Sequence, residues 1–204
     1  SNGAGKSTLM RTLSGLIVPT QGDILFEGAS IGNETPAQIL GRGIAHVPEG
    51  RRLFGAMSVE ENLLMGAYLR TQLSRAGLAH DLDRVYQIFP KLYERRRQAA
   101  LTMSGGEQQM CAIGRGLMSA PTLLMIDELS LGLAPVLIEQ LIASLIKLNK
   151  EGLSIFVVEQ DVVTALEFSH SSLVMDQGRI VRHGASVDLM ADPSIREAYL
   201  GEFA

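Results

Sequence analysis

The first eight residues of the chain have the composition and spacing of a loop that binds phosphate. They read Ser1-Asn2-Gly3-Ala4-Gly5-Lys6-Ser7-Thr8 and match the P-loop pattern G-x-x-x-x-G-K-[ST], except for its first glycine, which would precede Ser1. Backbone N–H groups of such a loop surround phosphate oxygens, and the following helix adds the positive end of its dipole. Lys6 would reach the β- and γ-phosphates, and the Ser7 hydroxyl would bind Mg²⁺. The segment from Asn2 to Thr8 therefore predicts a nucleoside triphosphate and Mg²⁺ as ligands.

The glycine that would precede Ser1 also predicts an N-terminally truncated chain. We expect the strand that enters the P-loop, and the first core strands with it, to lie before Ser1. A chain without them is expected to bind nucleotide weakly, because neighbouring strands would lack hydrogen-bonding partners. The alternative is a chance surface loop of this composition. It is disfavoured because Leu9, Leu13 and Leu16 recur at helical spacing directly after the loop.

Two acidic residues end a continuous apolar segment in the second half of the chain. Residues Leu123 to Ile126 are typical of a buried strand, and Asp127 and Glu128 follow them. Burying an acid is costly unless it is paired. Beside a P-loop, Asp127 would hold Mg²⁺, largely through water, and Glu128 would orient a water for in-line attack on the γ-phosphorus. The alternative is an ordinary strand-end turn, which the presence of the P-loop disfavours.

A third segment places a serine and two glycines before a helix: Leu101-Thr102-Met103-Ser104-Gly105-Gly106-Glu107-Gln108-Gln109. N–H groups at a helix N-terminus favour an anion, although Ser104 and Glu107 also have the spacing of a capping box. The segment resembles the signature L-S-G-G-E/Q-Q of the ABC ATPase family. The order of P-loop, signature and Asp-Glu strand agrees with that family along essentially all 204 residues. The resemblance implies that Ser104 to Glu107 bind the γ-phosphate of ATP held by a second ATPase subunit.

Two positions depart from the residues usual in that family. The segment Val47-Pro48-Glu49-Gly50-Arg51-Arg52-Leu53-Phe54 places Glu49 where a glutamine normally touches Mg²⁺ and the attacking water. The segment Val158-Glu159-Gln160-Asp161 places Gln160 where a histidine normally contacts the γ-phosphate. The predicted catalytic residues are therefore Glu128, Gln160 and Glu49. Because Gln160 cannot become cationic and Glu49 adds negative charge unless Arg51 or Arg52 compensates it, we expect slow turnover at this site.

These variant segments, together with Ser130-Leu131-Gly132-Leu133-Ala134-Pro135, are most similar to one ATPase subunit of branched-chain amino-acid importers, followed by urea and amide importers. The resemblance implies a heterodimer with a sister ATPase, two permease subunits and a periplasmic solute-binding protein, at the cytoplasmic face of the membrane. Leu129 replaces the family's usual proline, which is expected to loosen the turn after Glu128. Phe54, Met57 and the helix that begins at Val59 are candidates for the permease contact or, equally, for core.

Composition and charge restrict the alternatives. The formal net charge of −4 gives no support for nucleic-acid binding, and no apolar segment approaches the roughly 18 residues of a membrane span. A soluble ABC ATPase acting on ribosomes or DNA is disfavoured, because the chain has one cassette and no long coiled-coil insertion. An inactive truncated cassette is the remaining alternative.

The elements that must position these residues alternate between strand and helix. Strands are expected at residues 44–47, 123–127 and 154–159, and helices at 104–118 and 135–151. This rhythm predicts an α/β fold with a mainly parallel sheet, and the resemblance to the ABC ATPase family implies a RecA-like P-loop NTPase core. Residues 1–54 and 104–204 are assigned to the core and residues 55–103 to an inserted helical subdomain. The charged run from Glu94 to Arg97 is interpreted as a solvated face.

Overall fold

Three parallel strands lie at the centre of the structure, a computed structural model that describes residues 3–197. They are β3 (Ile44–Val47), β4 (Leu123–Asp127) and β5 (Ser154–Val158), and their order in the sheet is β3-β4-β5. In the register of the sheet, Ile44 lies opposite Leu123, and Leu123 lies opposite Ser154. Most of β4 is buried, as expected for the middle strand of a parallel sheet.

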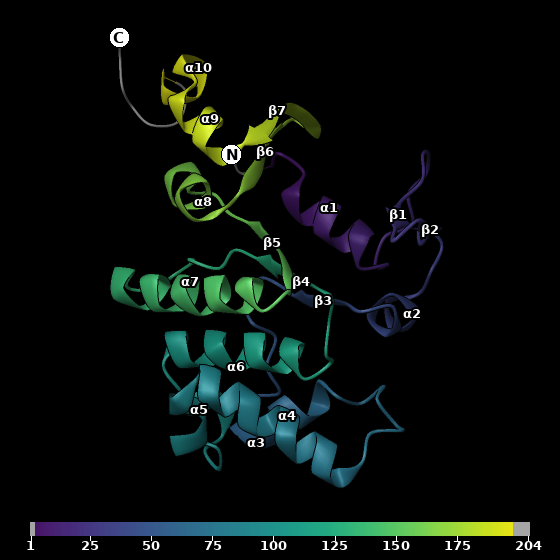
Figure 1. Ribbon diagram of the computed structural model, residues 1–204, viewed down its shortest axis with the longest axis vertical. Coiled ribbons are helices and arrows are strands. Elements are labelled where there is room, and N and C mark those ends of the chain that lie inside the picture. The colour runs from purple at the N-terminus through teal and green to yellow at the C-terminus, as the bar shows by residue number, and fades with distance from the viewer. Residues whose placement is uncertain (1–2, 198–204) are drawn as a thin grey trace.

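Each face of this sheet is covered by helices, because successive side chains of a strand point to opposite faces. On one face, Ile44 and Met125 pack with Met10 of α1 (Lys6–Leu13). On the other face, strand residues such as Leu124 and Ile126 pack against α6 (Gly105–Leu117) and α7 (Pro135–Lys150). Figure 1 shows α1 on one side of the strands and α6 and α7 on the other. The prediction of an α/β fold with a parallel sheet is confirmed.

A group of short helices lies beyond α6, on its side away from the sheet (Figure 1). Gly114 of α6 allows close packing there, since a Cβ at this position would lie 2.8 Å from Leu63 Cδ2 and 2.9 Å from Val85 Cγ1. Ser58 and Glu61 form a capping box that begins the first of these helices. The group comprises α3 (Val59–Met65), α4 (Arg75–Ile88), α5 (Pro90–Glu94) and the 3₁₀ helix η1 (Ala100–Thr102).

The remaining elements form two antiparallel hairpins and four short helices. Within residues 3–197, β5 pairs with β4 alone. The hairpin formed by β6 and β7 is joined to the P-loop by a hydrogen bond of 2.9 Å from Gly178 N to Ala4 O. Two of the four helices, α2 and α8, were not predicted. The elements are β1 (Leu25–Phe26), β2 (Ala29–Ser30), α2 (Pro36–Gly41), α8 (Val162–Phe168), β6 (Ser171–Asp176), β7 (Arg179–Ala185), α9 (Ser186–Ala191) and α10 (Pro193–Ile195).

His46 on β3 is a titratable side chain that the fold keeps neutral. Burial lowers the pKa of His46 from 6.5 to about 4, and its Nε2 atom has no hydrogen-bond partner. As the pH falls from 6.5 towards 4, the unfolded chain therefore takes up a proton that the folded chain does not. Protonation of His46 in the unfolded chain therefore lowers the free energy of unfolding as the pH falls through this window. The loss is at most about 3 kcal/mol, and none of it occurs above pH 6.5.

Replacing His46 by phenylalanine is expected to flatten the fall in the free energy of unfolding between pH 7 and pH 4.5, because phenylalanine cannot take up the proton. Urea denaturation at several pH values in this range measures the effect. The matched control is His183→Phe, since His183 is exposed on β7. An equally steep acid dependence in His46→Phe and the parent chain would show that His46 does not titrate in this way.

Candidate functional site

The P-loop leads directly into the start of α1. Asn2, predicted to bind phosphate, lies outside the described residues, as does Ser1. Gly5 has a φ of +99° and occupies the N-cap position, where it has no side chain that could cap the helix. The first turn, which includes Lys6, Ser7 and Thr8, also contains no acidic residue. N–H groups at the positive end of a helix dipole are suited to phosphate.

Asp127 is a buried carboxylate with an unsatisfied oxygen at the end of β4. The residue is only 5% exposed, and its Oδ1 atom has no hydrogen-bond partner. Burial raises the pKa of Asp127, the charges of Glu128 and Glu49 raise it further, and those of Lys6 and Arg11 oppose the change. These charges act on Asp127 from α1, from the loop after β3 and from the end of β4. The structure therefore brings the predicted P-loop, Glu49 and Asp-Glu residues together.

The orphaned oxygen of Asp127 fits a bound cation. Mg²⁺ in phosphate-transferring sites is held by one or two carboxylates together with substrate phosphates, rather than by a cage of protein ligands. A hydroxyl from the start of α1, that of Ser7, is the second oxygen ligand predicted here. Among residues 3–197 no group of three acidic, histidine or cysteine side chains could hold a metal ion.

Glu128 and Gln160 are directly joined. The Gln160 amide Nε2 donates to Glu128 Oε1 at 2.6 Å and to Oε2 at 2.7 Å. Glu128 itself has a φ of +56°, and its backbone N–H donates to Val158 O at 2.9 Å. A neutral amide that donates to both oxygens orients the carboxylate. Gln160 therefore holds the predicted general base.

Glu159 fixes the turn that carries Glu128, and sequence reasoning assigned it no role. Its carboxylate accepts from Ser130 N at 2.9 Å and from Ser130 Oγ at 2.8 Å. Burial raises the pKa of Glu159, and the bonds from Ser130 partly offset this. Leu129, expected to loosen the turn, is 1% exposed and belongs to the main hydrophobic cluster. Packing and the Glu159–Ser130 contacts therefore supply the constraint that proline would have given.

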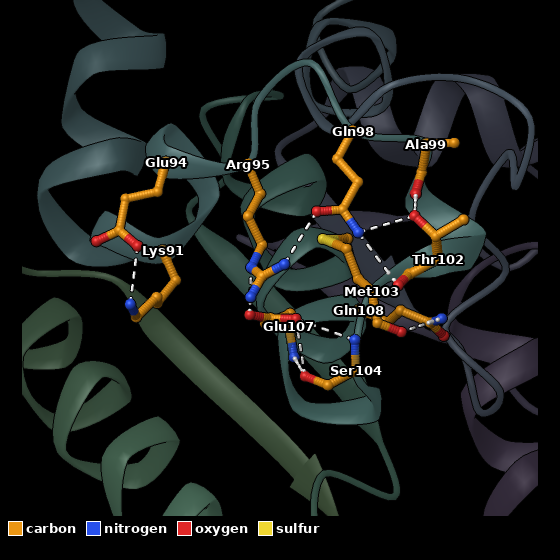
Figure 2. A network of polar contacts seen from close by, with 10 residues as sticks. All are labelled: Lys91, Glu94, Arg95, Gln98, Ala99, Thr102, Met103, Ser104, Glu107 and Gln108. Carbon is orange, nitrogen blue, oxygen red and sulfur yellow. Dashed lines mark hydrogen bonds and ion pairs between the residues drawn. The ribbon is translucent and has the colours of Figure 1, made fainter.

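The signature segment is held by a complete capping box (Figure 2). Glu107 Oε2 accepts from Ser104 N and from Ser104 Oγ, both at 2.9 Å, while Glu107 Oε1 lies 2.6 Å from Arg95 Nε. Burial alone would raise the pKa of Glu107, but the bonds from Ser104 and the charge of Arg95 outweigh it and lower the pKa. Glu107 is thus occupied in shaping the segment. The run from Glu94 to Arg97 is largely exposed, as interpreted from the sequence, and Arg95 in addition pairs with Glu107.

The two glycines of the signature segment allow close packing. A Cβ on Gly106 would lie 2.6 Å from Leu137 Cδ1 of α7, and one on Gly105 would lie 3.2 Å from Arg51 Nη2. A capping box alone gives no reason for these glycines, whereas the neighbouring side chains do. They bring α7 and the Glu49–Phe54 loop against the start of α6.

Glu49 is exposed, and its charge is not neutralised by the neighbouring arginines. Within the described part of the chain, neither Arg51 nor Arg52 forms an ion pair with it. The Arg51 guanidinium instead reaches Gln108 Oε1 at a long 3.5 Å, at the start of α6. Within residues 3–197, neither Arg51 nor Arg52 therefore compensates the charge of Glu49. This charge raises the pKa of Asp127.

Comparisons with known proteins agree with this geometry. Residues 1–130 match the protein family described as ABC transporter. The high-affinity branched-chain amino acid transport ATP-binding protein BraG of Pseudomonas aeruginosa is 46% identical over 201 residues, which cover 98% of this chain and 85% of that protein. A probable branched-chain amino acid transport ATP-binding protein, LivF of Archaeoglobus fulgidus, is 31% identical over 201 residues, covering 98% of this chain and 84% of that one.

Solved structures give the same answer for the fold. A nucleotide-free ATP-binding cassette from an ABC transporter superposes with a TM-score of 0.84 at 26% identity, covering 99% of this chain and 86% of that one. The ADP conformation of another such cassette gives a TM-score of 0.81 at 27% identity, covering 98% and 85%. The resemblance predicted from the P-loop, the signature and the Asp-Glu strand is confirmed: the chain belongs to the ABC transporter family, as one of its ATP-binding cassettes.

Proposed function

We propose that the chain is the ATP-hydrolysing subunit of an importer of branched-chain amino acids. The observation that carries the proposal is the 46% identity to BraG over 98% of the chain. It is supported by the convergence of Lys6, Glu49 and Glu128 on Asp127. The variant residues Glu49 and Gln160, from which the sequence predicted this class of transporter, belong to the same site.

Each residue of the site has a proposed part in hydrolysis. The start of α1 and Lys6 bind the β- and γ-phosphates, and Ser7 and Asp127 hold Mg²⁺. When bound, Mg²⁺ supplies positive charge beside these phosphates. Glu128 accepts a proton from the attacking water, and the Gln160 amide keeps the carboxylate in position for this transfer.

A second ATPase subunit is the proposed partner at the signature segment. Ser104 caps a 13-residue helix that begins with Gly105 and Gly106, and the N-terminus of such a helix favours an anion. Glu107 acts there through its cap on Ser104. We propose a sister subunit with the usual glutamine and histidine, so that two ATP molecules lie between two unlike cassettes. A periplasmic solute-binding protein would deliver the amino acid to the assembled transporter.

A pocket of about 320 Å³ beside the helical segment is the proposed contact with the permease. Its lining includes Phe54, Met65 and Tyr68, whose exposed fractions of 47%, 40% and 55% are large for such side chains. No helix in residues 3–197 is long and apolar enough to cross a membrane. We propose that docking here holds the subunit at the cytoplasmic face, with residues 55–103 as the helical subdomain.

Restoring the usual residues at the two variant positions is expected to raise the rate. In the assembled transporter, the double variant Glu49→Gln/Gln160→His should hydrolyse ATP about twofold to tenfold faster. A histidine can become cationic and bond more strongly to Glu128 or the γ-phosphate, and glutamine removes a negative charge beside Asp127. Steady-state phosphate release measures the rate.

The matched control makes the same two exchanges on the exposed face of α7, as Glu139→Gln/Gln140→His. Its rate should stay within about twofold of the parent. An unchanged or lower rate in the Glu49/Gln160 variant would contradict the expected slow turnover.

The transport assignment is tested by uptake into cells. Deleting the gene should abolish high-affinity uptake of labelled leucine, isoleucine and valine, and the parent gene should restore it. A Lys6→Ala gene, lacking the phosphate-binding ammonium, should not restore it. Normal uptake of these amino acids after deletion, with loss of labelled urea or acetamide uptake, would assign the chain to a urea or amide importer instead.

A further inference from the structure

The loop that follows Glu49 has a strained backbone. Three consecutive residues, Gly50, Arg51 and Arg52, have φ values of +74°, +63° and +48°. Glycine adopts such values freely, but arginine rarely does. Strained residues of this kind persist only where the surrounding structure holds them, and they concentrate at functional sites. The side chains that hold this loop are therefore of interest.

Arg115 of α6 holds the strained residues through their carbonyl groups. Its Nη1 donates to Arg52 O at 2.8 Å, and its Nη2 donates to Arg51 O at 3.1 Å. The guanidinium carbon also lies 5.7 Å from the centroid of the Phe54 ring. The planar fork of an arginine suits two acceptors side by side, which the single ammonium of a lysine cannot match.

The cost of this arrangement points to a role beyond packing. Burial lowers the pKa of Arg115, which means that the folded protein disfavours its charge. No carboxylate within residues 3–197 lies at ion-pair distance from it. Removing a cation from water without a counter-ion is unfavourable. The carbonyls of the loop and the Phe54 ring compensate the hydration that the Arg115 cation has lost.

Further contacts fasten the same loop to its surroundings. At the start of α6, the Arg51 guanidinium lies beside Gly105 and Gln108. At the end of the loop, Phe54 N donates to Asn62 Oδ1 at 2.9 Å, and Asn62 Nδ2 donates back to Phe54 O at 3.0 Å. The loop is thus tied to both ends of α6 and to α3.

We infer that Arg115 is a positioning residue for ATP hydrolysis, which ties the Glu49–Phe54 loop to α6 so that Glu49 and the signature segment move together. The inference rests on the proposed function. Glu49 acts on Asp127 at the chain's own nucleotide site, and the Ser104–Gly106 segment at the start of α6 faces the proposed partner's ATP. A 13-residue helix is a rigid connection about 20 Å long. A shift of α6 when the partner binds is therefore carried by Arg115 to Glu49.

The test replaces Arg115 by lysine in the assembled transporter, which keeps the charge and removes the fork. We expect kcat for ATP hydrolysis to fall about tenfold to a hundredfold, because the loop and the signature segment would no longer be held together and small misplacements in a site have effects of this size. The KM for ATP should stay within about threefold, since the P-loop is untouched. The matched control is Arg70→Lys. Arg70 donates to Met118 O at 2.9 Å, just beyond the end of α6, and to Asp81 at 2.6 Å, so neither acceptor belongs to the loop.

Hydrogen exchange of the assembled transporter without nucleotide gives a second readout that does not depend on activity. In Arg115→Lys, the amides of residues 50–54 should exchange at least about tenfold faster, while those of α6 keep the parent rate. Unchanged loop exchange, or an unchanged kcat, would overturn the inference. Faster exchange in α6 as well would overturn it too, because Arg115 would then support the fold in general. A parent transporter without ATPase activity would contradict the proposed function alone, and the exchange of the loop would still decide the role of Arg115.

Discussion

Glu128→Gln is expected to lower kcat for ATP hydrolysis about 10²- to 10⁴-fold in the assembled transporter, the usual contribution of a general base. Glutamine has nearly the same shape as glutamate, but it cannot accept the proton of the attacking water. The turn should survive the change, because Glu128 N still donates to Val158 O and Glu159 still holds Ser130. ATP binding should therefore remain within about threefold of the parent, since the P-loop residues are unchanged.

Single-turnover hydrolysis separates the chemical step from ATP binding, which equilibrium titration with a fluorescent ATP analogue measures. Glu139→Gln makes the same exchange on the exposed face of α7 and should leave both quantities unchanged. A single-turnover rate in Glu128→Gln within about threefold of the parent would remove Glu128 as the base. A matching loss of ATP binding would instead assign the glutamate to the binding of nucleotide.

Gly66→Ala is expected to destabilise the folded chain by about 3 kcal/mol, the upper part of the usual range for overpacking. A Cβ at Gly66 would lie 1.9 Å from the backbone oxygen of Arg115 and 2.9 Å from its carbonyl carbon. A side chain could rotate away, but a helix backbone cannot, so α3 and α6 would have to separate. Both helices contribute to the main hydrophobic cluster, and their separation would expose residues such as Leu63 and Ile113.

Urea denaturation followed by circular dichroism measures this loss. Gly41→Ala is the control, because no atom lies within 4 Å of the added Cβ. Gly41 is the last residue of α2, where alanine should stabilise by at most about 1 kcal/mol. Equal midpoints for Gly66→Ala and Gly41→Ala would show that α3 and α6 do not approach each other this closely.

Local signals in the sequence predicted the parts of the site that lie on one segment each. The P-loop and the Asp-Glu strand end were found because glycine, lysine and carboxylates at fixed spacing imply phosphate and Mg²⁺ chemistry. The capping box of Ser104 and Glu107 was also visible, since its members are three residues apart. The helix α2 was missed although Thr35, Pro36 and Gln38 gave a comparable start signal.

Contacts between distant segments could not be predicted in this way. Glu159 and Ser130 are 29 residues apart, and Arg115 and Arg52 are 63 apart, so no periodicity relates them. The run from Glu94 to Arg97 was interpreted from its charge alone, which does not reveal that Arg95 meets Glu107. In the same way, Leu129 was expected to loosen the turn after Glu128 because it has no proline ring. Its burial in the core instead constrains this turn.

We propose that this cassette hydrolyses ATP to drive the uptake of branched-chain amino acids. The most direct measurement is ATP hydrolysis together with labelled leucine uptake by the assembled transporter in proteoliposomes, with the solute-binding protein supplied outside. We predict that leucine-loaded binding protein stimulates hydrolysis and uptake in parallel, and that Lys6→Ala in this subunit abolishes both. ATP hydrolysis that does not respond to leucine, isoleucine or valine, or uptake that persists in Lys6→Ala, would contradict the account.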